Sequence, residues 1–299
     1  MQKNLILLLI VALTIIGCGK SDVHPYIPPV DENQFIDAEF GSDSTFEIVT
    51  WNIQEFPANG TVTVDLVEDA IEAMDVDIIA LQEISSSFRF AALLDSLPGW
   101  EGHMGAGDNY GHNLAMMWKT DVVSGQTYTI FDHDWYAFPR PPQVFEGTWN
   151  DKPFIIINNH LKAMSGSENE ERRELASVAL KEYVEEYFID QRVIITGDLN
   201  DEIQEEQFAP NVFWNFISDE NYLFVDMDIA EGSSSQWSFP SWPSHLDHIL
   251  INAQFFDEYN SGTAEVRTIQ LDDCLTGGLG EYRDDISDHL PVGFKVPLF

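Results

Sequence analysis

The sequence predicts a domain of the α/β class, in which buried strands alternate with helices that cover them. Two patterns carry this prediction. Short apolar runs alternate along the chain with stretches of helical periodicity. Several of the runs stay apolar until their last positions, as strands do when both of their faces are buried. The chain has 299 residues, 44% of them hydrophobic, so it is long enough to bury a full core.

The first residues of the chain have the features of an export signal. Lys3 is followed by an apolar run from Leu5 to Ile16, which is shorter than the ~20 residues that cross a bilayer. The letters IIGC at 15–18 resemble the bacterial lipobox, in which the signal is cut before a lipid-modified cysteine. This resemblance predicts a lipoprotein signal peptide over residues 1–17 and lipidation of Cys18. An ordinary secretory signal with a chance cysteine is the alternative.

Residues 18–43 are predicted to form a tether between the membrane and a domain that spans 44–299. The segment HPYIPPVDENQ carries three prolines and little periodicity, which suits an extended spacer. Cys274 is the other cysteine of the chain, so the domain has no internal disulfide if Cys18 is acylated. We therefore expect an exported, monomeric lipoprotein held on a bacterial membrane, in the cell envelope or at the surface, by a lipid anchor.

The elements of the domain begin with a strand, a helix and a second strand. FEIVTWN (46–52) and DIIALQE (77–83) are typical of strands with polar ends, and residues 64–74 between them have apolar positions at helical spacing. Further strands are predicted at 113–119, 153–161, 192–200, 246–252 and 289–296.

One helix is predicted with particular clarity over residues 167–187. Ser167 and Glu170 have the spacing of a capping box at its start. Several apolar residues fall near one side, as in a helix that packs one face on a core. They are Leu175, Val178, Tyr183 and Tyr187.

The charge of the chain excludes some classes of function. The formal net charge is −37, from 51 acidic and 14 basic residues. Such a surface repels polyanions, although salt screens the effect over ~8 Å. This argues against a protein that binds nucleic acid through a broad basic face. It leaves room for a local site in which metal ions offset the charge.

Polar residues stand where several of the predicted strands end. Ligands of layered α/β folds gather at the carboxyl ends of strands. Neighbouring strands lie ~4.8 Å apart, so groups that end adjacent strands can meet around one ion. The endings are Asn52, then Gln82 and Glu83, then Asn158 and His160, then Asp198 and Asn200.

Six short motifs resemble, in order, those of the endonuclease/exonuclease/phosphatase superfamily, also called the deoxyribonuclease I-like fold. Each motif is weak alone, but six in order are specific. The resemblance covers about residues 46–297 and implies a four-layer sandwich of two packed mixed β-sheets flanked by helices. It also implies a metal-dependent phosphoester hydrolase of the phosphodiesterase or nuclease type. The motifs are WN (51–52), LQE (81–83), NNHL (158–161), GDLN (197–200), LDHIL (246–250) and SDHLP (287–291).

The resemblance implies a metal site and its ligands. A phosphoester is anionic and repels hydroxide, and a hard divalent cation offsets that charge. Glu83 matches the family's principal metal carboxylate, with Asn52 and Asp288 as further ligands. Because these groups offer oxygen, Mg²⁺ is the expected ion, and Mn²⁺ or Ca²⁺ is also compatible.

The resemblance also implies the residues that act on the substrate. Asp198 would orient or deprotonate the attacking water, and Asn200 would steady it. His289 would donate to a phosphoryl oxygen or accept the proton of the water, with Asp247 fixing its tautomer and raising its pKa. His160 would stabilise the transition state or protonate the leaving oxygen.

Two further residues are assigned to the substrate phosphate by the same resemblance. Arg140 suits a bidentate grip on a phosphate, and its alternative is a surface salt bridge. Asn158 is the second, and its alternative is to cap the end of a strand.

The function remains open between three hypotheses. Beside the phosphoesterase, a zinc hydrolase could use His160, His248 and His289, although these lack a local zinc spacing. A non-catalytic acidic lipoprotein that binds cations or partners is the third. For the phosphoesterase, the substrate could be nucleic acid, phospholipid or a small phosphodiester, since selectivity lies in loops. We expect His245 and the histidines outside these motifs to lie on the surface or in loops.

Overall fold

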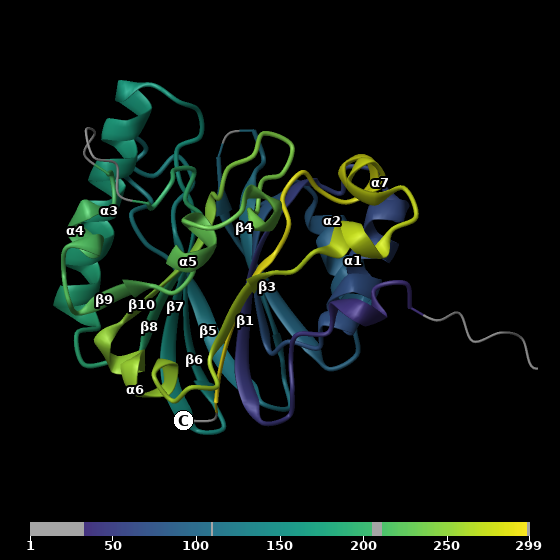
Figure 1. Cartoon of the computed structure of the whole chain (residues 1–299), viewed down its shortest axis with the longest axis horizontal. Coiled ribbons are helices and arrows are strands. Elements are labelled where there is room, and N and C mark those ends of the chain that lie inside the picture. Colours follow the sequence, from purple (N-terminus) through teal and green to yellow (C-terminus); the bar gives the residue numbers. More distant parts are fainter. Residues whose placement is uncertain (1–32, 109, 205–210, 298–299) are drawn as a thin grey trace, which may run out of the picture. The chain divides into compact units, whose positions relative to one another are not determined.

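The computed structural model describes residues 33–108, 110–204 and 211–297. Within these residues, two six-stranded sheets pack face to face, with helices on both outer sides (Figure 1). The predicted α/β class and the four-layer sandwich of mixed sheets are therefore confirmed.

The first sheet has the strand order β11-β12-β1-β2-β4-β3. Strands β1 and β2 are parallel to each other, and the other neighbours are antiparallel. The strands are β1 (Thr45–Phe56), β2 (Ile78–Ile84), β3 (Trp100–Gly107), β4 (Asn113–Lys119), β11 (Glu265–Thr268) and β12 (Val292–Pro297).

The second sheet has the order β5-β6-β7-β8-β10-β9. Here β7 and β8 form the parallel pair, and the remaining neighbours are antiparallel. The strands are β5 (Val123–Thr129), β6 (Gln143–Trp149), β7 (Lys152–His160), β8 (Val193–Asp198), β9 (Tyr222–Phe224) and β10 (Asp247–Asn252).

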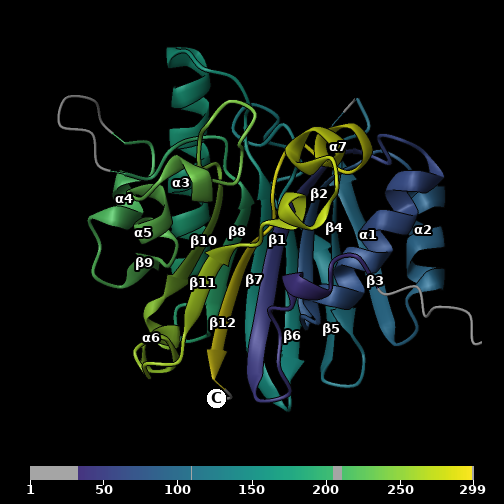
Figure 2. The same ribbon diagram turned by 45° about the vertical axis from the view of Figure 1, so that its right-hand side comes forward.

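Helices cover the outer face of each sheet (Figure 2). The first sheet carries α1 (Thr61–Met74), α2 (Ser87–Ser96) and α7 (Gly278–Asp285), and the second carries α3 (Ser167–Tyr187), α4 (Trp214–Ile217) and α5 (Met227–Ala230). Short elements complete the fold: α6 (Phe256–Tyr259) and the 3₁₀ turns η1 (Ile36–Ala38), η2 (Ser234–Gln236), η3 (Ala253–Phe255) and η4 (Leu271–Cys274).

Three apolar cores hold these layers together. One lies between the two sheets and contains Phe46, Ile156 and Phe294. The other two lie under the outer helices, around Trp51 for the first sheet and Leu180 for the second. The central strands of the two sheets, such as β1, β2, β7 and β8, are therefore buried on both faces over most of their length, which explains their long apolar runs.

Helix α3 buries a different face from the one predicted. Leu175, Val178 and Tyr187 are exposed, whereas the buried side consists of Arg173, Ala176, Ser177, Leu180 and Val184. The capping box is also absent, because Gly166 is the N-cap residue and no side chain caps the helix. The polar residues on the buried face have partners: Arg173 bonds to the loops after β7 and β8, and Ser177 bonds to Asn215 of α4.

The packed domain includes residues that precede position 44. Phe35 and Phe40 are buried in the core of the first sheet, beside α1 and η4. The signal peptide and Cys18 lie outside the described residues, so their assignment stays a prediction. None of the helices in the described part of the chain has the length and apolar character needed to cross a membrane.

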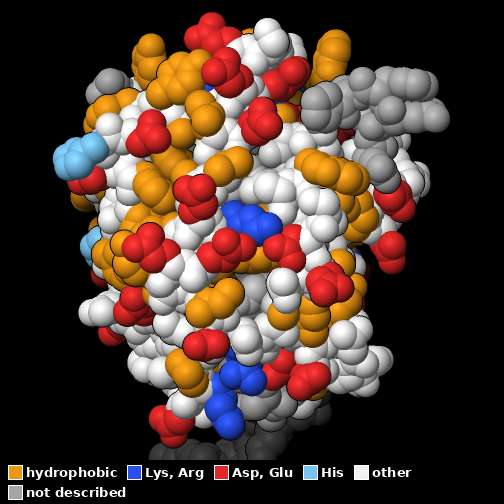
Figure 3. All heavy atoms as spheres, turned by 90° about the vertical axis from the view of Figure 1, so that its left-hand side faces the viewer, with side chains coloured by type: hydrophobic (Ala, Val, Ile, Leu, Met, Phe, Trp, Pro, Cys, Tyr) orange, Lys and Arg blue, Asp and Glu red, His pale blue; other side chains and the backbone are white. Residues whose placement is uncertain are grey.

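Acidic side chains do not form a single patch on the face of the molecule shown in Figure 3. On the face shown in Figure 3 they are scattered between apolar and neutral groups, and Lys and Arg are few.

Candidate active site

The polar strand ends meet at one end of the two sheets. The parallel pairs β1–β2 and β7–β8 finish there, and the antiparallel strands β10 and β12 begin there. In register, Asp198 pairs with both His160 and Asp247. Segments far apart in the sequence thus deliver their polar residues to one place, as the sequence predicted.

A pocket of about 890 Å³ opens at this end. Seven of the residues predicted from the sequence line it: Glu83, Arg140, His160, Asp198, Asn200, Asp288 and His289. Asn52 and Asp247 lie directly behind the lining and contact it through their side chains.

Irregular backbone aims these side chains into the pocket. Glu83 has φ of 63°, and the pairing of β2 with both neighbours shifts register next to it. Asn200 has φ of 56°, another left-handed conformation. Gly197 has φ of 132°, and a Cβ there would lie 1.9 Å from the carbonyl oxygen of Asn159. Glycine is therefore needed at 197 for β7 and β8 to approach closely before Asp198.

Asn52 connects two carboxylates across the two sheets. Its Nδ2 donates to Glu83 Oε1 at 3.2 Å and to Asp198 Oδ2 at 3.0 Å. Its Oδ1 accepts from the amide of Gln54. The second oxygen of Glu83 accepts from the amide of Glu55 at 3.0 Å. In this arrangement Asn52 orients carboxylates with its amide nitrogen, and its role as an oxygen ligand stays a prediction.

Several carboxylates are crowded at the floor of the pocket. Burial, together with the nearby Asp247 and Glu83, raises the pKa of Asp198 to about 7, although His289 and Asn52 act in the opposite direction. Burial also raises the pKa of Asp288, with Glu83 and Asp247 adding to the effect. Uncompensated negative charge of this kind suits a divalent cation.

His289 is held by a buried carboxylate. Its Nδ1 lies 2.7 Å from Asp247 Oδ2, and the Asp247 carboxylate is fully buried. Burial alone would lower the pKa of His289, but Asp247, Asp198 and Asp288 raise it to about 10. The ring is therefore an imidazolium near neutral pH. Its Nε2 lines the pocket, 3.9 Å from Asp198 Oδ2.

The main chain around His289 is fixed by three further bonds. Tyr282 Oη donates to the carbonyl of His289 at 2.6 Å, and Trp51 Nε1 donates to the same carbonyl at 3.2 Å. The His289 amide donates to Ser287 Oγ, and the ring of Phe239 lies 4.6 Å from the imidazole. The segment before β12 thus carries a rigidly placed histidine.

His160 and Arg140 form a second pair in the pocket. Arg140 Nη2 lies 2.5 Å from His160 Nε2, and since arginine can only donate, this histidine nitrogen accepts. Burial lowers the pKa of His160 well below its usual value, and Arg140 lowers it further. His160 is therefore neutral, 3.4 Å from Asp198 Oδ2.

The sequence model of the Endonuclease/Exonuclease/phosphatase family matches residues 49–289, the span that contains every group described above. The chain belongs to this family. The resemblance seen in the sequence is thereby confirmed. A comparison with curated proteins finds no match.

Solved structures share the fold of this family member at low sequence identity. A humanized TDP2 of D. rerio superposes with a TM-score of 0.64 at 13% identity, over 85% of this chain and 99% of that one. The human Nocturnin catalytic domain with bound sulfate gives 0.61 at 18% identity, over 85% and 95%. A mannosyl-6-phosphatase of Bacteroides thetaiotaomicron gives 0.58 at 15% identity, over 85% and 100%.

One residue assigned by the family resemblance does not reach the pocket. The Asn158 side chain is fully buried between the sheets and absent from the pocket lining. Its Nδ2 donates to the carbonyls of Leu81 and Ala115, and its Oδ1 accepts from Gln82 at 2.8 Å. Asn158 therefore ties β7 to β2 and β4, and the structure does not place it on a phosphate.

Other pocket residues were missed by sequence reasoning. Asp108 is in the loop before β4. Its Oδ2 lies 4.0 Å from Arg140 Nη1 and 3.0 Å from His112 Nδ1. Arg173 extends from α3 to the pocket wall although it is only 3% exposed. Arg173 lies on a helix, and Asp108 directly follows β3, a strand that was not predicted from the sequence, so the strand-end pattern gave no signal for either residue.

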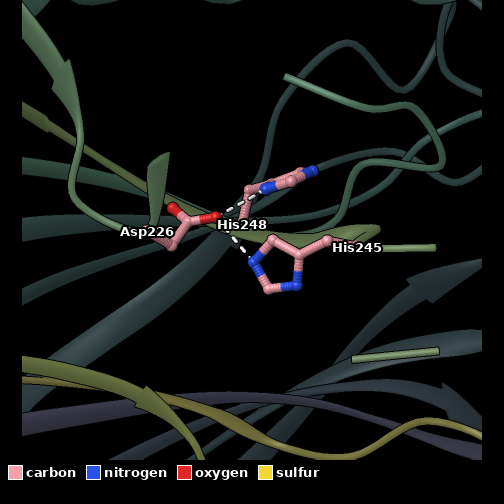
Figure 4. Close-up of side chains that lie close together, drawn as sticks. All are labelled: Asp226, His245 and His248. Atoms are coloured by element: carbon pink, nitrogen blue, oxygen red, sulfur yellow. Dashed lines mark hydrogen bonds and ion pairs between the residues drawn. The ribbon is translucent and has the colours of Figure 1, made fainter. Parts of the chain in front are cut away.

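Two further histidines are buried outside the pocket lining. His245 and His248 are buried around Asp226, behind the pocket (Figure 4). His245 lies in the loop before β10, one of the two positions expected for it, but it is buried rather than at the surface. The zinc set of His160, His248 and His289 is not brought together, because His248 bonds to Asp226 while the other two line the pocket.

Proposed function

We propose that this chain is a divalent-metal-dependent phosphoester hydrolase. The observation that carries the proposal is the convergence of Asp198, the Asp247–His289 pair and the Arg140–His160 pair on one pocket. These supply a base, a cationic acid and a phosphate-binding guanidinium within one site.

The residues at the pocket floor fit a divalent cation. Glu83 and Asp288 are the carboxylates that would hold it, beside Asp198, and oxygen donors of this kind suit Mg²⁺, with Mn²⁺ or Ca²⁺ as alternatives. When bound, the cation would offset the charge of the phosphoester and polarise a phosphoryl oxygen.

The electrostatics of the pocket support a separate role for each proposed catalytic group. Asp198, with a pKa raised to about 7, has the basicity to take a proton from water near neutral pH. Asn200 extends from the same loop and lines the pocket beside it. His289, as an imidazolium, donates from Nε2 to a phosphoryl oxygen, while Asp247 stabilises its charge.

In this proposal Arg140 binds the phosphoryl group. It is 8% exposed, and its Nε is buried without a hydrogen-bond partner among the described residues. A substrate oxygen would satisfy this donor and draw the guanidinium from His160. The lone pair of His160 Nε2 would then be free to accept a hydrogen bond from water or substrate, and the proton taken up by the leaving oxygen would come from the His289 imidazolium.

The charge of the pocket favours a small substrate over a long polynucleotide. The lining is strongly acidic, and of its two arginines Arg173 is already engaged with Asp201 and two carbonyls. A polyanion would gain few cationic contacts here. Exposed Trp242 and Met164 border the pocket and offer apolar contact to an uncharged leaving group. The acidic lining residues are Glu55, Glu83, Asp108, Glu170, Asp198, Asp201, Glu202 and Asp288.

The names of the structural neighbours include both kinds of substrate, nucleic acid and small phosphoester. One TDP2 structure contains a single-strand DNA product, and the Bacteroides protein is named as a sugar-phosphate phosphatase. For this chain, a small phosphodiester or a phospholipid headgroup suits the pocket better than DNA or RNA.

A hydrolysis panel with Mg²⁺ tests the proposal. It would contain plasmid DNA, RNA, sphingomyelin, a sugar phosphate and bis-p-nitrophenyl phosphate. We expect Mg²⁺-dependent cleavage of a small phosphoester or sphingomyelin, and at least tenfold slower cleavage of nucleic acid. Inactivity across the panel would support a non-catalytic lipoprotein, and stoichiometric zinc in the purified protein would support a zinc hydrolase.

We further propose that the enzyme is displayed on a bacterial membrane through lipid on Cys18. The support is the lipobox-like sequence IIGC at 15–18 and the tether that follows it. Cys18→Ser should move the protein from the membrane fraction to the soluble fraction and abolish palmitate labelling. Unchanged membrane association of this variant would contradict lipid anchoring.

A further inference from the structure

Behind the pocket, Asp226, His245 and His248 form a second polar cluster that is fully enclosed (Figure 4). Their exposed fractions are 0%, 1% and 0%. His248 follows Asp247 in β10, and successive side chains of a strand point to opposite faces. Asp247 therefore faces His289, whereas His248 faces the outer core, with its ring 5.9 Å from that of Phe224.

The hydrogen bonds of the cluster fix the position of its protons, beginning with His245. The amide of Ser238 donates to His245 Nδ1 at 3.3 Å, so this nitrogen carries a lone pair. The proton of the neutral ring is then on Nε2, which donates to Asp226 Oδ2 at 3.0 Å.

His248 meets acceptors on both sides. Its Nε2 lies 2.9 Å from the carbonyl oxygen of Asp201, which can only accept, so Nε2 carries a proton. Its Nδ1 lies 2.6 Å from Asp226 Oδ2, and this contact also needs a proton. The other oxygen of Asp226 accepts from the amide of Ile249 at 2.9 Å.

The shared proton belongs on the imidazole. The usual pKa of histidine, about 6.5, exceeds that of aspartate, about 3.9. Burial alone would lower the pKa of His248, but Asp226 raises it above its usual value. Burial would raise the pKa of Asp226, but His248 and His245 hold it below its usual range. His248 is thus a buried imidazolium paired with an aspartate.

This pattern does not suit a metal ion at the cluster. A cation would need lone pairs on the histidine nitrogens that face Asp226. His245 points a proton there instead, because the Ser238 amide occupies its other nitrogen. The three residues are a hydrogen-bonded ion pair with a neutral histidine beside it.

The ion pair reaches the catalytic loop through Asp201. This residue follows Asp198 and Asn200 after β8, and its carbonyl is the acceptor for His248. Its carboxylate accepts from Arg173 Nε at 2.8 Å. The Arg173 Nη1 also donates to the carbonyls of Lys162 and Met164, in the loop after His160. Two buried cations, one from α3 and one from β10, therefore hold the two loops that follow β7 and β8.

We propose that His248, kept protonated by Asp226, is a positioning residue for the active site. Its Nε2–H bond to Asp201 fixes the segment 199–202 and so the direction of Asp198 and Asn200. The expected effect on turnover rests on the proposed function, whereas the effect on the loop does not.

Hydrogen exchange of the loop tests the proposal without any substrate. In His248→Gln, a neutral side chain cannot bridge Asp226 and Asp201, and we expect the amides of Asn200 and Glu202 to exchange at least tenfold faster. Both amides donate to carboxylates of this loop. His245→Gln is the matched control, because His245 bonds to the same carboxylate but not to the loop. Equal exchange of these amides in both variants and the parent would overturn the proposal.

Turnover adds a second readout. With bis-p-nitrophenyl phosphate and Mg²⁺, His248→Gln should lower kcat by about 10–100-fold with KM within about threefold of the parent, because a displaced catalytic group costs turnover more than binding. His245→Gln should keep kcat within about threefold. An inactive parent would refute the proposed function and leave the exchange result to decide on the loop.

The protonation of His248 can be measured in the parent itself, in case the variants do not fold. The ring is faced by Asp226, His245 and the Asp201 carbonyl, with Asp247 adjacent. Nitrogen-15 spectra of labelled histidine should show both ring nitrogens of His248 protonated from pH 6 to 8. A lone-pair nitrogen on this ring within that range would contradict the ion pair.

Discussion

Two histidine–aspartate pairs start from neighbouring residues of β10 and end in different environments. Asp247 holds His289 at 2.7 Å, and His248 is held by Asp226 at 2.6 Å, with both carboxylates fully buried. The second ring nitrogen of His289 lies 3.9 Å from Asp198 Oδ2, in the lining of the pocket. His248 gives its second nitrogen to the Asp201 carbonyl. The two pairs have the same residue types, but the His289 ring is available to a substrate whereas the His248 ring holds a loop in place.

The carboxylates of the two pairs also differ in how many of their oxygens accept hydrogen bonds. Asp226 uses both oxygens, with His245 and His248 on one and the Ile249 amide on the other. Asp247 Oδ1 is buried without a hydrogen-bond partner among the described residues. Incomplete satisfaction is common where function, rather than stability, places a group.

The largest expected effect is a loss of turnover when Asp198, in the pocket, is replaced. Asp198→Asn should lower kcat by about 10³-fold or more, because the variant cannot accept a proton. Its free energy of unfolding should not fall, because the replaced carboxylate is buried at a cost that raises its pKa to about 7. Steady-state kinetics and urea unfolding measure both quantities. Retained turnover would show that Asp198 is not the base.

The Asp226–His248 pair should behave in the opposite way, so that replacing its carboxylate lowers stability. Asp226→Asn leaves a buried imidazolium without its counter-ion, and we expect the free energy of unfolding to fall by about 3–5 kcal/mol. Urea denaturation at pH 7 measures this. Asp247→Asn is the comparison and should cost less stability, because His289 borders the pocket and can release its proton to water. Equal losses in the two variants would erase the distinction drawn between the pairs.

Asp247→Asn should instead reduce turnover by about 10²-fold, since the carboxylate fixes the ring of His289 and stabilises its charge. The decisive quantity is the ratio of kcat loss to stability loss, compared between Asp247→Asn and Asp226→Asn. The account requires the ratio to be larger for Asp247. A larger ratio for Asp226 would mean that the Asp226–His248 pair, and not the Asp247–His289 pair, mainly serves turnover.

A third buried acidic group offers a further comparison because it consists of two neighbouring carboxylates, and a nearby lysine, Lys119, only partly offsets the effect of burial on the pKa of Asp77. At the opposite end of β1, burial raises the pKa of Glu47 to about 8 and that of neighbouring Asp77 to about 6. The folded protein therefore holds protons that the unfolded chain releases above about pH 4.5. This contribution lowers stability as pH rises from about 5 to 8. Asp226 has the opposite sign, because its lowered pKa adds stability above the usual aspartate value.

The smallest expected effect is on the pH dependence of stability, because the raised pKa of Glu47 makes stability fall as pH rises. Glu47→Gln should flatten the fall in unfolding free energy between pH 5 and 8 and stabilise the protein by about 1–3 kcal/mol at pH 8. Urea unfolding at several pH values measures the slope. A parent whose stability rises over this window would contradict a protonated Glu47.

Much of the site could be predicted from the sequence because the signal is local. An apolar run that ends in a polar residue marks a strand end, and strand ends of this fold converge, which found Glu83, His160 and Asp198. The same rule failed for Asn158, because it lies two residues before His160 on the same face of β7 and so points between the sheets. Depth along a strand, which decides this, is a tertiary property.

The buried ion pair could not be predicted, because its partners are far apart in sequence. Asp226 lies 19 residues before His245, and no periodic pattern links them. The buried face of α3 was missed for a related reason. Arg173 and Ser177 are polar residues that face inward to bond with loops and with α4, while Leu175 and Val178 are exposed. Hydrophobic periodicity cannot identify such a face.

The central claim is that the pocket hydrolyses a phosphoester with His289 as its cationic acid. The most direct measurement is Mg²⁺-dependent release of p-nitrophenol from bis-p-nitrophenyl phosphate by the parent and by His289→Gln. The account predicts turnover by the parent that excess chelator abolishes, and a loss of at least about 10²-fold in the variant. Undiminished turnover in the variant, or in excess chelator, would contradict it.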